Sequence, residues 1–119
     1  MSTIPDNLVS AAYRGDFQAV RRLLSTGAHS EGTRYMALAG ATFYGHEKAV
    51  EELLNDSLYT PYALGEALDC AVRRSLPGVV RVLLGARPPL DCVGTLAEWV
   101  ADKKNAETIR LLQKYGKEV

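Results

Sequence analysis

Four similar segments follow one another along this chain of 119 residues. The first, AAYRGDFQAVRRLLSTGA at positions 11–28, aligns with later segments after shifts of 30, 60 and 89 positions, so successive copies are displaced by 30, 30 and 29 positions. Tandem copies of this length are typical of proteins in which each unit buries its apolar face against the next. The recurrence therefore favours a stack of repeated units.

Each copy has the pattern of two short helices with a turn between them. Apolar residues recur at i, i+3 and i+4 in both halves of the first copy: Leu8, Ala11 and Ala12, then Val20, Leu23 and Leu24. No segment alternates apolar and polar residues as a half-buried strand does. The pattern predicts an all-α stack of helix-turn-helix units.

Glycines mark the predicted ends of these helices. Gly15 and Gly45 stand between the two halves of the first two copies, where a residue with positive φ would reverse the chain. Three further glycines lie near the ends of the second helices, where left-handed caps are common: Gly27, Gly85 and Gly116.

The shared pattern A-A-x-x-G-[D/H]-x-x-x-V-x-x-L-L-x-x-G-A resembles the ankyrin repeat. The resemblance runs from about Asp6 to Lys117 and divides a single domain, residues 1–119, into repeats at about 6–28, 36–57, 62–87 and 95–117. It implies an ankyrin-like solenoid of four helix-turn-helix units. Because the copies are shorter than the family's usual repeat of about 33 residues, the β-hairpin loops between repeats should be shortened or absent.

The chain also departs from the family's pattern. The T-P-L-H sequence that opens the first helix of an ankyrin repeat is replaced by DNLV, MALA, EALD and TLAE in the four copies. Ser75 takes the place of the turn glycine in the third copy, and Lys104 takes it in the fourth. We interpret the chain as a divergent array.

The resemblance also predicts where a partner protein would bind. Ankyrin proteins commonly grip partners with the two residues that follow the alanine pair and with the connection before the first helix. On this chain these positions are Tyr13, Arg14, Phe43, Tyr44, Arg73, Arg74, Asp102 and Lys103, with Tyr35 in the connection. Aromatic residues and arginine carry much of the binding energy at protein interfaces. The alternative is that Phe43 turns inward and fills space against the third copy, and that Tyr13 caps the exposed first repeat.

Composition and motifs exclude several function classes. Fourteen basic and fourteen acidic residues give a net charge of zero, which argues against binding driven by phosphates or anionic lipid. Nucleotide-binding, hydrolase and zinc-protease motifs are absent from the sequence. We therefore expect no cofactor, metal site, membrane segment or small-molecule substrate.

The sequence thus predicts a non-enzymatic module, monomeric and cytoplasmic, that binds another protein as an adaptor or as an inhibitor of the immunity-protein type. Two alternatives remain open. One is a small enzyme or ligand-binding protein with a site around Cys92, His29 and the aromatic residues. The other is a nucleic-acid-binding repeat protein that uses Arg14, Arg73 and Arg74, which the neutral charge disfavours.

Overall fold

The computed structural model describes residues 7–27, 29–57, 59–88, 91, 93, 96 and 106–118. Within these ranges the chain forms seven helices and no strand, which confirms the all-α class. The chain divides into two compact units, residues 1–58 and 59–119. The first contains α1 (Leu8–Arg14), α2 (Phe17–Thr26), α3 (Glu31–Phe43) and α4 (Glu47–Asp56); the second contains α5 (Pro61–Arg73), α6 (Pro77–Gly85) and α8 (Ala106–Glu118).

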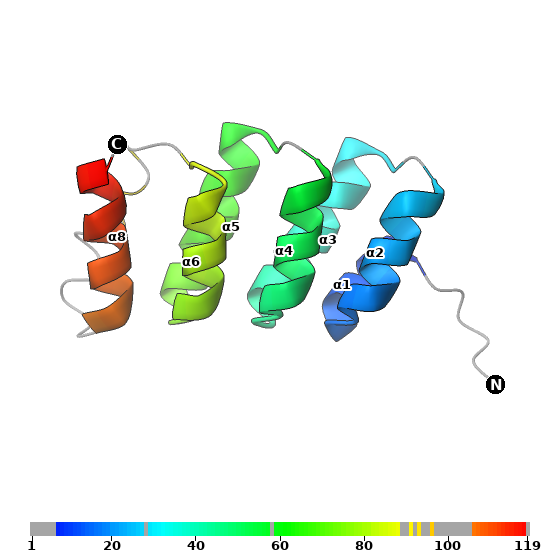
Figure 1. Cartoon of the computed structure of the whole chain (residues 1–119), viewed down its shortest axis with the longest axis horizontal. Coiled ribbons are helices and arrows are strands. Elements are labelled where there is room, and N and C mark those ends of the chain that lie inside the picture. The colour runs from blue at the N-terminus through cyan, green and yellow to red at the C-terminus, as the bar shows by residue number, and fades with distance from the viewer. Residues whose placement is uncertain are drawn as a thin grey trace. The chain divides into compact units, whose positions relative to one another are not determined.

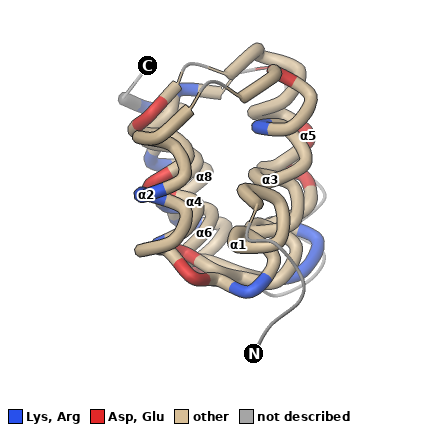
Figure 2. Tube along the Cα trace, turned by 90° about the vertical axis from the view of Figure 1, so that its right-hand side faces the viewer, with Lys and Arg blue, Asp and Glu red and all other residues tan. Residues whose placement is uncertain are grey.

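The first unit consists of two helical hairpins packed side by side. Helices α1 and α3 form one layer, and α2 and α4 form the other (Figures 1 and 2). The buried residues of the first layer are mostly small, which allows α1 and α3 to pack closely; they include Ala11, Ala12, Ala37, Gly40 and Ala41.

An ion pair links the two helices of the other layer. Arg21 of α2 donates to a carboxylate oxygen of Glu52 of α4 over 2.6 Å. This hydrogen bond lowers the pKa of Glu52, while partial burial opposes the shift. The pair lies near the surface, so its contribution to stability is small.

The same turn joins the helices of all three hairpins. The residue after the turn donates its N–H to a carbonyl oxygen five positions back in each case: Asp16 to Ala11 at 3.0 Å, His46 to Ala41 at 2.9 Å and Leu76 to Ala71 at 3.0 Å. The residue before this donor has a left-handed backbone conformation each time, with φ of 75° at Gly15, 73° at Gly45 and 56° at Ser75. The predicted turns therefore recur once in each of the first three copies, even where serine replaces glycine.

The first helices of the second and third hairpins begin earlier than the sequence predicted. Helix α3 starts at Glu31 and α5 at Pro61, because the side chains of Ser30 and Thr60 cap them by accepting hydrogen bonds from the N–H groups of Thr33 and Ala63, each at 3.1 Å. Tyr35 is consequently a helical residue of α3, and its prediction as a connection residue was wrong.

The prediction of glycine caps was also wrong. Gly27 follows α2 with an extended backbone at φ −169°, Gly85 is the last residue of α6 without a left-handed backbone, and Gly116 lies inside α8. Beyond α6 the left-handed position belongs to Arg87, whose φ is 64°. Glycine permits a left-handed conformation but does not require one.

In the second unit α6 packs against both α5 and α8. Val79, Val80 and Leu83 of α6 are buried, as is Leu112 of α8. Tyr115 of α8 is buried as well, and its hydroxyl donates to the carbonyl oxygen of Pro88 over 2.7 Å. That bond fixes the C-terminal end of α8 to the segment after α6.

Among the described helices, none is both long and apolar enough to cross a lipid bilayer.

The turn geometry predicts that Ser75→Gly stabilises the protein. A non-glycine residue in the left-handed region costs about 1–2 kcal/mol. Glycine offsets part of this gain because it increases the conformational entropy of the unfolded chain. We expect the free energy of unfolding to rise by about 0.5–1 kcal/mol, measured by urea denaturation. Gly45→Ser, at the equivalent turn, should shift it in the opposite direction. A lower unfolding free energy for Ser75→Gly would contradict the left-handed assignment.

A second prediction concerns the buried hydroxyl of Thr42. This residue is 0% exposed, and its Oγ1 has no hydrogen-bond partner among the described residues. Ala12 and Val72 occupy the equivalent positions in the other hairpins. We expect Thr42→Val to raise the free energy of unfolding by about 1 kcal/mol, since it removes an unsatisfied polar group at nearly constant volume. The exposed control, Thr26→Val, should change it by less than about 0.5 kcal/mol.

Candidate functional site

Three of the predicted binding residues form a cluster of aromatic rings on the first unit. Tyr13 lies near the end of α1, Phe43 ends α3, and Tyr44 comes next in the turn. The ring centroids of Tyr13 and Tyr44 lie 5.8 Å apart, and those of Phe43 and Tyr44 lie 5.0 Å apart in an edge-to-face arrangement. We call these three residues the aromatic patch.

The aromatic patch is open to solvent. Tyr13 is 44% exposed, Phe43 is 43% exposed and Tyr44 is 54% exposed. The side chains of Phe43 and Tyr13 are not among the buried residues that form the core of the first unit. Large aromatic side chains that stay this exposed are common at protein-binding sites.

A glycine on α3 makes room for the ring of Tyr13. A Cβ atom built on Gly40 would overlap the Cδ1 and Cε1 atoms of Tyr13, so the ring lies directly against the helix backbone. Any larger residue at position 40 would force the ring to move. The position of Tyr13 over α3, and hence its contact with Tyr44, depends on this one missing side chain.

His46 packs beside the patch and holds one of its residues. Its Nε2 atom forms a hydrogen bond of 3.0 Å with the carbonyl oxygen of Tyr13, and its ring is stacked near that of Tyr44 with centroids 6.3 Å apart. The imidazole also packs against Gly15, where a Cβ atom would overlap it. His46 therefore fixes the end of α1 to the start of α4.

The solvent-facing side of α3 extends the apolar surface toward its N-terminus. Met36 and Ala39 are exposed and lie about two and one helical turns before Phe43, on the same side of the helix. The sequence pattern did not single out Met36, because the helix was expected to start there. The signal that could have found it is the i, i+3, i+7 spacing of Met36, Ala39 and Phe43.

Helix α5 of the second unit carries charges at the equivalent positions. In the next copy, Glu66, Asp69 and Arg73 align with Met36, Ala39 and Phe43. The Nε of Arg73 donates to both carboxylate oxygens of Asp69, at 2.9 and 3.0 Å. At these three positions, therefore, α3 is apolar and α5 is charged.

The other predicted binding residues are not all gathered at the patch. Arg14 is exposed next to Tyr13, and one of its guanidinium nitrogens lies 3.9 Å from a carboxylate oxygen of Asp16. Tyr35 is half-buried in the second turn of α3. Arg73 and Arg74 are exposed in the second unit, and Asp102 and Lys103 lie outside the described residues.

The structure describes only part of the alternative ligand or catalytic site suggested around Cys92, His29 and the aromatic residues. His29 is half-buried, and its Nε2 forms a hydrogen bond of 2.8 Å with the carbonyl oxygen of Leu23. Cys92 lies outside the described residues. Burial raises the pKa of the Cys70 thiol, which disfavours the reactive thiolate. No group of three or more potential metal ligands occurs in the described ranges.

A search of family models found no match to this chain, and no curated protein matches it. The geometry of the site is therefore the basis for assigning a function.

The packing of Tyr13 against Gly40 leads to a test of the patch geometry. We expect Gly40→Ala to displace the Tyr13 ring, because the new methyl group occupies its place. The measurement is the set of nuclear Overhauser effects between the rings of Tyr13 and Tyr44, which should disappear. Gly32→Ala on the same helix is the control, since its Cβ meets only Ser30 Oγ, at 3.9 Å. Persistence of the ring contacts in Gly40→Ala would show that the site is built differently.

Proposed function

We propose that this chain is a small helical-repeat protein of ankyrin type that binds another protein through the aromatic patch. The observation that carries the proposal is the contact between three aromatic rings that are each more than two-fifths exposed. The fold does not require these rings at the surface, because the buried residues beneath them already pack α1 against α3. A partner that covered them would remove a large apolar area from water.

The repeat interpretation is supported by the recurrence of one turn in three hairpins. The left-handed residue and its flanking hydrogen bonds repeat from one copy to the next. Helical starts at Glu31 and Pro61 also support the expectation of short connections, since the residues that a β-hairpin loop would occupy belong to α3 and α5. The proposal is a solenoid in which the hairpins are the repeating units.

The chemistry of the patch indicates the kind of segment it would bind. Two tyrosines offer hydroxyl groups beside an apolar surface, and Met36 adds a flexible side chain that adapts to different shapes. Arg14 lies next to this surface and is suited to an acidic residue of the partner. We expect an apolar segment with a nearby acidic residue, and the protein would act as an adaptor or would mask a surface of the bound protein.

The first experiment identifies the partner by site-specific photocrosslinking in extracts of the source cells. A benzophenone amino acid at position 43 should form a covalent adduct with a discrete protein, which mass spectrometry then names. The same probe at Gln18, an exposed residue of α2, should not give that adduct. Adducts that are the same at both positions would contradict a binding site at the patch.

The second experiment measures affinity with the purified partner. We expect Phe43→Ala and Tyr44→Ala each to weaken binding by about 30-fold or more, corresponding to the roughly 2 kcal/mol typical of a central interface residue. Gly40→Ala should weaken binding although every aromatic residue is retained, because it moves the Tyr13 ring. Lys117→Ala, on α8, should bind as the unmodified protein does. Unchanged affinity in folded Phe43→Ala and Tyr44→Ala would refute the proposal.

A further inference from the structure

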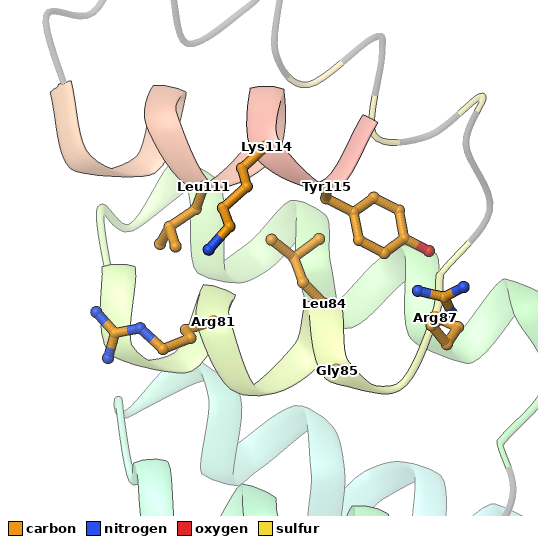
Figure 3. A pocket seen from close by; sticks show the side chains of 7 residues that line it. All are labelled: Arg81, Leu84, Gly85, Arg87, Leu111, Lys114 and Tyr115. Atoms are coloured by element: carbon orange, nitrogen blue, oxygen red, sulfur yellow. The ribbon is translucent and has the colours of Figure 1, made fainter. Parts of the chain in front are cut away.

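A pocket of about 270 Å³ lies between α6 and α8 in the second unit. It is distinct from the aromatic patch, which belongs to the first unit. Figure 3 shows the side chains that line it, with Lys114 reaching from α8 toward α6 and Arg87 beside the ring of Tyr115. Its lining consists of Arg81, Leu84, Gly85, Arg87, Leu111, Lys114 and Tyr115.

The pocket combines an apolar wall with positive charge. Leu84, Leu111 and the ring of Tyr115 supply the apolar wall. Three cations, Arg81, Arg87 and Lys114, line the same pocket, and none of its described lining residues carries a carboxylate. One of these cations, Arg81, is paired at 2.9 Å with Glu107 of α8. An anionic group on an apolar body matches both parts of this lining.

Two backbone features, at Gly85 and at Arg87, shape the pocket. Gly85 is the last residue of α6, where alanine would stabilise the helix, and a Cβ atom there would meet nothing within 4 Å. Packing therefore does not require glycine at position 85, and its lack of a side chain leaves the pocket open. Arg87 holds a left-handed backbone, with φ of 64°, while its guanidinium lies 5.9 Å from the centroid of the Tyr115 ring.

The hydroxyl of Tyr115 is not part of the recognition chemistry. It is engaged with the carbonyl oxygen of Pro88, so the ring is fixed in orientation and presents its apolar surface and edge to the pocket. The lining thus offers cationic donors and apolar contacts. The positive charge of this lining repels a cationic ligand, and a neutral ligand gains no electrostatic attraction from it.

We propose that the pocket between α6 and α8 binds a small organic anion, with a carboxylate or phosphate group on an apolar body of about ten non-hydrogen atoms. The anionic group is held by Lys114 and a neighbouring arginine, and the body lies against Leu84, Leu111 and Tyr115. The volume corresponds to about nine water molecules, enough for one aromatic ring and its acidic group. This binding would amend the expectation that the protein has no small-molecule ligand.

The test is a titration of the isotopically labelled protein followed by amide chemical shifts. Phenylacetate should shift the amides of Leu84, Gly85, Leu111 and Tyr115 and saturate. 2-Phenylethanol, which is nearly the same size but uncharged, should bind at least tenfold more weakly. Phenyl phosphate in place of phenylacetate decides between the two anionic groups, and binding of either supports the proposal. Equal affinity for phenylacetate and 2-phenylethanol would overturn it, as would saturable binding of inorganic phosphate alone as tight as that of phenylacetate.

Variants at the pocket separate binding there from binding elsewhere. Gly85→Leu should fill the pocket and weaken phenylacetate binding at least tenfold, and the open space at this position means that it should still fold, as checked by thermal melting. Lys114→Met should weaken binding severalfold. The matched control is Lys117→Met, which removes one positive charge from the same helix at an exposed residue that does not line the pocket. Unchanged binding in folded Gly85→Leu, or equal losses in the two lysine variants, would place the ligand elsewhere and overturn the proposal.

Discussion

Close packing of α1 against α3 is the constraint on which the rest of the first unit depends. The residues that these helices bury are largely alanine and glycine, with Ala11, Ala12 and Ala41 at 0% exposure. Small side chains let two helix backbones approach closely, and they leave no space for a large ring between them. Tyr13 therefore lies on the surface over Gly40, and its ring meets Tyr44 there. The position of Tyr13 in the aromatic patch is thus a consequence of a core built from small residues.

Much of the hairpin architecture could be predicted from the sequence because it is local. Apolar residues at i, i+3 and i+4 specify the buried side of a helix. The short interruption between two such patterns locates the turn at which the chain reverses. The errors arose at helix ends. Ser30 and Thr60 begin α3 and α5 through side-chain caps that the family pattern does not contain. Arg87, and not Gly85, takes the left-handed position after α6, which residue preference alone does not predict.

The candidate site was predictable only in part. Alignment of the copies brought Tyr13, Phe43 and Tyr44 to equivalent or adjacent positions, and these residues do meet in space. Their contact nevertheless depends on Gly40, which the pattern does not contain, and on His46, which the pattern contains only as the residue after the turn glycine. The pocket between α6 and α8 was missed altogether. It arises where two helices that are well separated in the sequence meet, and helical periodicity within one segment does not report such contacts.

The contrast between α3 and α5 indicates which positions of such a hairpin are free to vary. Both helices bury apolar residues on one side, so the requirements of packing are met before the exposed side is considered. On α5 the exposed side holds Asp69 and Arg73, which form an ion pair with each other. On α3 the same positions hold Ala39 and Phe43, and exposing a phenylalanine to water carries a free-energy cost that the fold itself does not require. Under the proposed function, a bound protein covers Phe43 and supplies the apolar contact that the fold leaves open.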